Sequence, residues 1–336
     1  MPEAMQAWEV RDGRLDLHTV EKPEAGGDTS VVRVVSAGVC ASDVAKLTKE
    51  VIPTPPGQPW RPGHEIVGYA ADAYGRERPV AINTLVPCGA CDRCRAGEIN
   101  VCPHLRLIGW ALPGGFAPFV EVPRAGVVSL PDGLDDSVAV LADPMAVAVH
   151  GIRCGLGPPA GRLGVIGGGA LGVASAAYAA ARGWRTDVLV RDTSRLASVA
   201  GILDATIRPL GSVRPGEYDA IVDAAGGKDD TAFVAALDAV RDGGRIVVQT
   251  TYHPGVRLTR DLREPIRRGL TVVGSFTFCR KGGDDFRLGL DFLAGHSDWA
   301  KPYAGHRYPL DGLPQALDDL CSRRPDRPVK AVLGIG

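Results

Sequence analysis

The chain has 336 residues, which is enough for two domains with a substantial core. Hydrophobic residues make up 45% and charged residues 23%, and the formal net charge is −1, values typical of a soluble globular protein. A near-neutral chain without a basic run is a poor match for nucleic acid or an anionic membrane, and no apolar run is long enough to span a bilayer.

The N-terminal residues indicate a cytoplasmic protein. Glu3 is acidic and no apolar stretch follows it, so no secretory signal is visible. Eight Cys in such a chain favour metal ligation over disulfides.

Residues up to about 123 predict an irregular, largely β domain. Short β-branched segments at 31–35, 80–83 and 119–122 are separated by turns rich in Gly, Pro and Asp. Long loops are expected at 51–62 and 86–115.

Two parts of this region, Cys40 and the pair His64-Glu65, carry donors that could converge on one metal. Each has another interpretation. A lone Cys in a Val-rich strand is often a small buried hydrophobic residue, and a His beside a Glu is as often a surface pair.

A stronger signal follows in the second long loop. Cys88, Cys91, Cys94 and Cys102 form C-x2-C-x2-C-x7-C, which suits tetrahedral Zn²⁺. The connecting residues are small or polar, so zinc would supply much of the folding energy of a lobe at about 86–104. An iron–sulfur cluster and redox pairing are the alternatives. Four protein thiolates leave no open position, so the site is expected to be structural.

The next region, 146–276, alternates strands with Ala-rich helices. A strand at 162–166 runs into G-x-G-x-x-G, followed by a helix at 173–182. This arrangement predicts a Rossmann domain, with a nucleotide pyrophosphate at the helix N-terminus. The motif consists of Gly167, Gly168, Gly169, Ala170, Leu171 and Gly172.

The end of the second strand, 187–190, bears on the choice of nucleotide. Arg191 stands at or beside the position where NAD-binding units carry an acid, and Arg195 follows one turn later. These cations favour NADP(H). NAD(H) stays possible, because a shift of one residue would place Asp192 on the ribose.

The C-terminal part contains two expected helices, at 285–293 and 313–321, and a closing strand at 329–333. Cys154, Cys279 and Cys321 are isolated in the sequence, so they are expected to be buried or incidental thiols.

Several motifs in one order resemble the zinc-dependent medium-chain alcohol/polyol dehydrogenases, of the sorbitol, threonine and aminocyclitol dehydrogenase type. They are Gly-Val-Cys-Ala-Ser-Asp at 38–43, Pro-Gly-His-Glu at 62–65, the four-Cys loop, and Gly-Gly-Phe-Ala-Pro-Phe at 114–119. The resemblance implies a GroES-like catalytic domain at 1–145, the Rossmann domain at 146–276, and a segment at 277–336 that completes the catalytic domain. It also implies two zinc ions per chain and a homodimer or homotetramer.

The same resemblance implies a catalytic zinc held by Cys40, His64 and Asp143. Asp143 stands where the family usually has Glu before Pro, and it is one methylene shorter. In this scheme Glu65 either supports the ligands from outside or binds the zinc transiently. Asp143 could instead cap the helix that begins at Pro144. His150, seven residues later, is expected to pack rather than to ligate.

The implied reaction is the reversible oxidation of a secondary alcohol, such as a polyol, cyclitol, amino alcohol or sugar derivative, by NAD(P)⁺. Ser42 would accept the alcohol proton, and Asp43 would support the ligands. Many relatives place a His where this chain has Ala45, so protons would leave through water, the cofactor ribose or Lys46. The alternative function is a nucleotide-binding sensor or regulator of the same fold without catalytic zinc.

Overall fold

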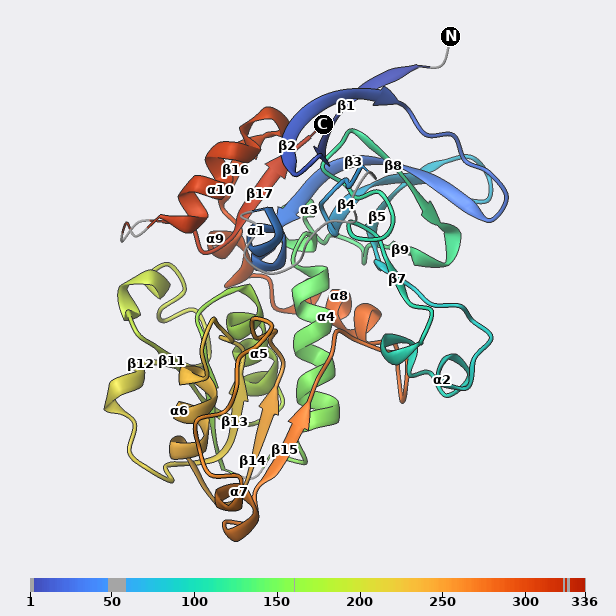
Figure 1. The fold of residues 1–336 in the computed structure, drawn as a ribbon. Coiled ribbons are helices and arrows are strands. Elements are labelled where there is room, and N and C mark those ends of the chain that lie inside the picture. The colour runs from blue at the N-terminus through green and yellow to red at the C-terminus, as the bar shows by residue number, and fades with distance from the viewer. Residues whose placement is uncertain (1–2, 48–58, 160, 323, 325–326, 336) are drawn as a thin grey trace. The chain divides into compact units, whose positions relative to one another are not determined.

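The computed structural model describes residues 3–47, 59–159, 161–322, 324 and 327–335 (Figure 1). Most of the loop expected at 51–62 therefore lies outside the described residues. The chain forms two compact units: unit 1 contains Met1–Asp143 and Leu293–Gly336, and unit 2 contains Pro144–Phe292.

Unit 1 is built on a mixed sheet with the order β16-β17-β3-β4-β5-β9 in the described part of the chain, and β8 pairs with β3 as well. The pairs β1–β2 and β6–β7 form separate two-stranded sheets. The strands of unit 1 are β1 (Ala4–Arg11), β2 (Arg14–Glu21), β3 (Thr29–Val39), β4 (Glu65–Ala71), β5 (Glu77–Ile82), β6 (Leu85–Val86), β7 (Arg106–Leu107), β8 (Phe119–Pro123), β9 (Val127–Ser129), β16 (His306–Pro309) and β17 (Ala331–Gly334). Its helices are α1 (Ala41–Leu47), α2 (Asp92–Arg95), α3 (Asp136–Ala139), α9 (Ala300–Tyr303) and α10 (Leu313–Cys321).

Strand β3 is the centre of unit 1. Val32 and Val34 are buried with the period of two that one face of a strand requires, and the strand is continuously buried from Ser36 onward. The core on this strand also contains Phe116 and Leu333. The end of β3, which leads to Cys40, is therefore held firmly.

The hairpin β1–β2 was not expected from the sequence. Its turn is Asp12-Gly13, and both residues have positive φ, 50° and 76°. Asp-Gly is a strong hairpin signal, because this turn requires two residues that tolerate positive φ.

Unit 2 is a parallel sheet with the order β12-β11-β10-β13-β14-β15 (Figure 1). This is the order of a doubly wound Rossmann sheet, so the predicted fold class is confirmed. The elements are β10 (Arg162–Ile166), β11 (Arg185–Val190), β12 (Thr206–Pro209), β13 (Tyr218–Asp223), β14 (Val240–Val248), β15 (Thr271–Gly274), α5 (Ala170–Ala181), α6 (Thr231–Ala239) and α7 (Arg263–Arg267).

Two helices begin in one unit and end in the other, namely α4 (Ala142–His150) and α8 (Asp285–Gly295). Among the described residues, no helix is both long and apolar enough to cross a membrane.

Candidate active site and metal centres

Strand pairing brings Cys40 and His64 together. β3 ends one residue before Cys40, β4 begins one residue after His64, and the two strands are antiparallel with Gly38 opposite Glu65. As a result, one donor atom from each of Cys40, His64 and Glu65 lies within 4.8 Å of the others. A thiol, an imidazole and a carboxylate at this spacing form a potential metal site.

Asp43 connects the two sides of this group. It lies in the first turn of α1 and is fully buried. Its Oδ2 accepts a hydrogen bond from the backbone N–H of Cys40 at 3.1 Å, and its Oδ1 lies 3.3 Å from His64 Nδ1. A carboxylate on one ring nitrogen fixes the imidazole and directs the other nitrogen elsewhere, as in many metal sites.

The charge of the group suits a cation. Burial on its own would lower the pKa of His64, but the Asp43 carboxylate and the Cys40 thiol raise it well above its ordinary value. The donors thus create a negative environment that holds a proton on His64, and a divalent ion would satisfy the same environment. The residues present therefore fit a zinc ion.

Glu65 already has a partner. Lys330, the residue before β17, forms a buried ion pair with Glu65 Oε2 and also donates a hydrogen bond to the carbonyl of Val39 at 3.3 Å. Both side chains are at most 2% exposed. Lys330 was not singled out from the sequence, although a lone Lys in an otherwise apolar closing segment is an available signal.

Asp143 lies close to the group but outside its tightest cluster. Thr84 donates a hydrogen bond to its Oδ2 at 3.3 Å. Burial raises the pKa of Asp143 to about 6, and the Glu65 charge adds to this while His64 and Lys330 oppose it. Burial disfavours ionisation of this carboxylate in the metal-free protein, and a nearby cation would stabilise its charged form. Thr84 is a further contact that the sequence did not reveal.

Helix α1 also carries Ser42 and Lys46. Ser42 is half-buried in the first turn, two residues from Cys40. Lys46 is 9% exposed, and its Nζ lies 3.3 Å from the ring centroid of Trp110 and 4.7 Å from that of Trp60. Burial lowers the pKa of Lys46 to about 8, against the opposing charge of Asp43.

The four cysteines of the lobe converge as their spacing suggests. Their sulfur–sulfur distances are 3.5 Å for Cys91–Cys94, 3.6 Å for Cys102–Cys88, 3.8 Å for Cys91–Cys102 and 3.9 Å for Cys88–Cys94. Sulfurs bound to one tetrahedral zinc stand about 3.8 Å apart, given a Zn–S length of about 2.3 Å. All four thiols are free.

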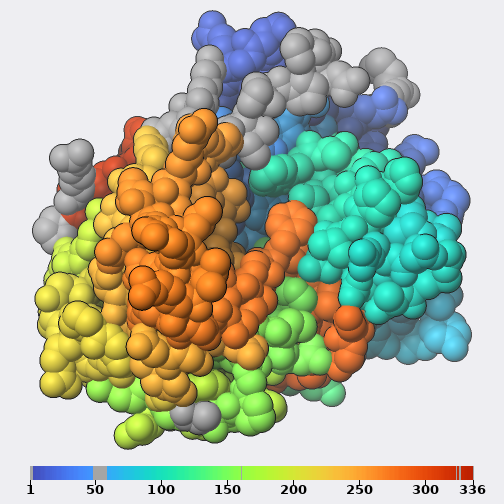
Figure 2. Space-filling model, turned by 60° about the horizontal axis from the view of Figure 1, so that its bottom comes forward, coloured from blue at the N-terminus to red at the C-terminus, as the bar shows by residue number. Residues whose placement is uncertain are grey.

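Within the lobe, burial is confined to Ile99, Asn100 and Cys102 among residues 86–104. Helix α2 buries no side chain, and the surrounding segment, turquoise in Figure 2, forms part of the exposed surface. Backbone N–H groups of Ala90 and Cys91 lower the pKa of Cys88 to about 6, whereas desolvation and the neighbouring thiols raise that of Cys94 to about 12. Four crowded sulfurs cannot all ionise without a cation, so this donor set also fits zinc.

In unit 2, the glycine motif forms the turn between β10 and α5. Gly167 has φ 116°, and a Cβ on Gly172 would lie 2.0 Å from the carbonyl oxygen of Gly167. Gly169 precedes α5, and an added Cβ there would meet no described heavy atom within 4 Å. Two glycines thus allow the tight turn, and the third leaves open backbone at the N-terminus of a 12-residue helix, where a pyrophosphate fits.

The end of β11 presents the residues expected to select the nucleotide. Arg191 is exposed and follows the strand directly. Asp192 Oδ1 accepts hydrogen bonds from the backbone N–H of Ser194 at 3.0 Å and from its hydroxyl at 2.6 Å. The Asp192 carboxylate is therefore engaged in its own turn.

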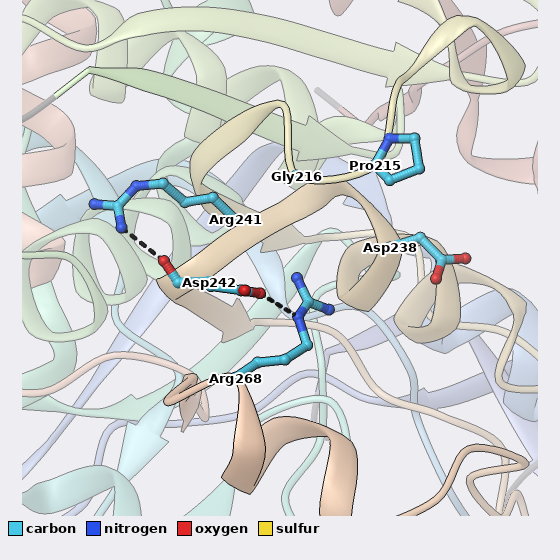
Figure 3. Close-up of a pocket in the computed structure, with 6 residues that line it drawn as sticks. All are labelled: Pro215, Gly216, Asp238, Arg241, Asp242 and Arg268. Atoms are coloured by element: carbon cyan, nitrogen blue, oxygen red, sulfur yellow. Dashed lines mark hydrogen bonds and ion pairs between the residues drawn. The ribbon is translucent and has the colours of Figure 1, made fainter.

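A hollow of about 550 Å³ lies elsewhere in unit 2 (Figure 3). Its lining comes from Pro215 and Gly216 before β13, Arg241 and Asp242 at the start of β14, Asp238 near the end of α6 and Arg268 after α7. The amino ends of β13 and β14 lie opposite the sheet edge that carries the glycine turn. Asp242 accepts a hydrogen bond from Arg268 at 2.7 Å, and its backbone carbonyl accepts one from Arg241 at 2.8 Å. Each charged lining residue has an ion-pair partner, Asp242 with Arg268, Arg241 with Asp219 and Asp238 with Arg260, and the hollow is not part of the candidate site.

Comparison with known proteins agrees with this geometry. A family model described as the alcohol dehydrogenase GroES-like domain matches residues 26–132. The chain is 31% identical over 350 residues to the protein named "Probable alcohol dehydrogenase AdhA" of Mycobacterium tuberculosis (strain CDC 1551 / Oshkosh), with 95% of each chain covered. It is 29% identical over 332 residues to L-galactonate-5-dehydrogenase of Escherichia coli (strain K12), with 90% of this chain and 92% of the relative covered.

Among solved structures, galactitol-1-phosphate dehydrogenase from Escherichia coli shares the fold, with a TM-score of 0.84 at 22% identity. That match covers 98% of this chain and 100% of the other.

The chain belongs to the zinc-containing medium-chain alcohol and polyol dehydrogenase family. It is an enzyme, a zinc dehydrogenase that oxidises alcohols or polyols with NAD(P).

Proposed function

We propose that this enzyme oxidises a secondary alcohol reversibly to a ketone at a catalytic zinc bound by Cys40, His64 and Asp143. The observation that carries the proposal is the cluster of Cys40, His64 and Glu65 donors within 4.8 Å of one another. The buried Asp43 contacts both the Cys40 backbone and His64 Nδ1. Three protein ligands leave the open position that a catalytic zinc needs.

Asp143 is proposed as the third ligand because Glu65 is already committed. The Glu65 carboxylate is neutralised by the buried Lys330, whereas Asp143 accepts a hydrogen bond from the neutral hydroxyl of Thr84. Glu65 then supports the site and approaches the metal only when its ion pair loosens.

The chemistry divides between bound groups and the chain. When bound, zinc supplies Lewis acidity toward the substrate oxygen and the nicotinamide supplies a hydride acceptor. Ser42 hydrogen-bonds the substrate hydroxyl and takes its proton while passing its own hydroxyl proton to water, the cofactor ribose or Lys46. Asp43 keeps His64 and the Cys40 backbone in place, so the ligands do not rearrange during turnover.

The nucleotide is proposed to be NADP(H), with its pyrophosphate on the turn Gly167–Gly172. Arg191 and Arg195 would face the 2′-phosphate. The support is that Asp192 Oδ1 accepts two hydrogen bonds from Ser194 within its own turn, while the exposed Arg191 directly follows the strand.

The substrate is proposed to be a polyol, cyclitol, amino alcohol or sugar derivative. The support is the carboxylate in the ligand set and the similarity to L-galactonate-5-dehydrogenase across nearly the whole chain. Several hydroxyl groups on one substrate suit a site that offers the polar side chain of Ser42.

The test is a panel of NAD⁺ and NADP⁺ with secondary alcohols, followed by nicotinamide absorbance. Asp143→Ala and Ser42→Ala are expected to lower kcat/KM at least about 100-fold. The matched controls, Asp132→Ala and Ser129→Ala, change exposed residues of unit 1 and should retain activity. Full activity in either site variant contradicts the mechanism, and a strong preference for NAD⁺ contradicts the role of Arg191.

A further inference from the structure

A second cluster of metal-binding side chains lies within unit 2, away from the glycine turn. His150 ends α4, Cys279 lies in the loop after β15, and Asp285 begins α8. All three are buried, and one donor atom from each lies within 4.8 Å of the others. The proposed reaction uses none of them.

His150 Nδ1 is the centre of the cluster. Cys279 Sγ and Cys154 Sγ each lie 3.6 Å from it, and Asp285 Oδ2 lies 2.9 Å from it. A thiolate and an imidazole bound to the same tetrahedral zinc stand about 3.5 Å apart, since Zn–S is about 2.3 Å and Zn–N about 2.0–2.1 Å. Both sulfur–nitrogen distances match this spacing.

The groups around these donors hold them as the outer residues of a metal site do. Arg153 forms an ion pair with Asp285 Oδ1, which leaves Oδ2 facing the cluster. The backbone N–H of Cys279 donates to Asp285 Oδ2 at 2.9 Å. Hydrogen bonds of this kind orient ligands and tune their basicity.

The four-Cys lobe offers an internal comparison. There, the N–H of His104 donates to Cys102 Sγ, two residues earlier, at 3.4 Å. In this cluster the N–H of Lys281 donates to Cys279 Sγ with the same separation and the same 3.4 Å. N–H groups aimed at a sulfur favour the thiolate that binds a metal.

We propose that His150, Cys279 and Asp285 form a third metal site, with Cys154, which lies beside His150, turning in as a further ligand; the site takes Zn²⁺ or a similar divalent ion that prefers thiolate and imidazole ligands. Two thiolates and one carboxylate are balanced by a divalent ion and the Arg153 guanidinium. Cys154 is exposed, so the ion can enter from solvent. The ion would tie the end of α4 to the start of α8. This site is independent of the proposed reaction.

The direct test is the zinc content of the purified full-length enzyme by elemental analysis after gel filtration. Cys279→Ser and Cys154→Ser are each expected to hold one zinc ion fewer than the parent. Cys321→Ser, the matched change at an exposed Cys outside the cluster, should equal the parent. Equal zinc content in the parent and both cluster variants overturns the proposal. Because Cys154 is exposed, its variant tests the site even if Cys279→Ser fails to fold.

A second measurement separates a metal site from a metal-free clamp of hydrogen bonds on Asp285. Alkylation of Cys154 in the native enzyme is followed by mass spectrometry, with and without a zinc chelator. Bound metal predicts alkylation at least tenfold faster after chelation, and no such change in Cys279→Ser. Alkylation of the exposed Cys321 in the same samples reports any effect of the chelator on the reagent itself. An unchanged Cys154 rate contradicts the proposal.

Discussion

The four-Cys lobe and the Cys40 group use similar donors in opposite settings. In the lobe, four sulfurs lie 3.5–3.9 Å from their neighbours and face one another. The Cys40 group combines three different donors, a thiol, an imidazole and a carboxylate. Residues outside the group hold two of them, because Asp43 contacts His64 and Lys330 pairs with Glu65. The first arrangement is closed, and the second keeps room for another ligand.

The two regions also differ in what supports the backbone. The lobe is short, and α2 contributes no buried side chain. The Cys40 group instead stands at the end of β3, inside the main core of unit 1. Metal in the lobe should therefore govern stability, and metal at Cys40 should govern activity. The following experiments test this distinction.

The largest effect is expected for His64→Ala. Loss of a zinc ligand should remove about 4 kcal/mol of transition-state stabilisation, which corresponds to about a thousandfold in kcat/KM. Because the β3 core stays intact, the melting temperature should change little. Activity assays, calorimetry and zinc analysis check this. His104→Ala, at an exposed side chain in the lobe, is the control and should keep full activity. A large fall in melting temperature for His64→Ala would contradict the distinction.

Cys102→Ser should produce the opposite result. The lobe loses a ligand and with it a zinc ion that supplies folding energy, so stability should fall by about 3 kcal/mol or more. Activity per folded molecule at low temperature should stay within about threefold of the parent, since the four lobe cysteines and the Cys40, His64 and Glu65 donors form separate clusters. Denaturant unfolding measures the change, with Cys321→Ser as the control. Unchanged stability would mean that the lobe does not rely on metal.

Asp43→Asn should give a smaller effect on activity. The amide keeps the shape but loses the charge beside His64 Nδ1, and loss of such outer partners costs about 10–100-fold in metal affinity or activity. Steady-state kinetics with zinc titration should show weaker metal binding that excess zinc partly restores. Asp92→Asn, at an exposed lobe position, should behave as the parent. Equal behaviour of the two variants would remove the positioning role of Asp43.

Much of this organisation follows from local sequence. The β-branched run at 31–35 predicts the central strand, and the glycine motif between a strand and a helix predicts the Rossmann unit; the structure confirms both. The lobe is also local, because its ligands lie within 15 residues. Short spacing fixes proximity almost regardless of the remaining fold.

The long-range contacts could not be predicted in this way. Lys330 meets Glu65 across 265 residues, and only the pairing of β17 with β3 and of β3 with β4 brings them together. Cys279 is buried, as expected, whereas Cys154 is exposed, and their common neighbour His150 was not expected from the sequence. Both lie against His150, and Cys279 reaches it across 129 residues. A thiol that is isolated in sequence need not be isolated in space.

The smallest expected effect concerns Lys46, which lies on α1 beside the Cys40 group. Burial lowers its pKa to about 8, so a neutral amine becomes available as pH rises through 8. If this amine receives the proton from Ser42, kcat/KM for alcohol oxidation rises between about pH 7 and 9 in the parent. Lys46→Met should flatten that rise and cost at most about tenfold at pH 9. Rate profiles of the two proteins measure this.

Stability against pH separates this role from packing between Trp60 and Trp110. The pKa of Lys46 is lower in the folded chain than in the unfolded one, so the unfolded chain binds more protons between about pH 8 and 10.5. The parent should therefore gain stability as pH rises through that window, and Lys46→Met should not. A variant that loses this gain but keeps the parent's rate profile assigns Lys46 to packing alone. Protons would then leave the open site through water or the cofactor ribose, while the closed lobe needs no such exit.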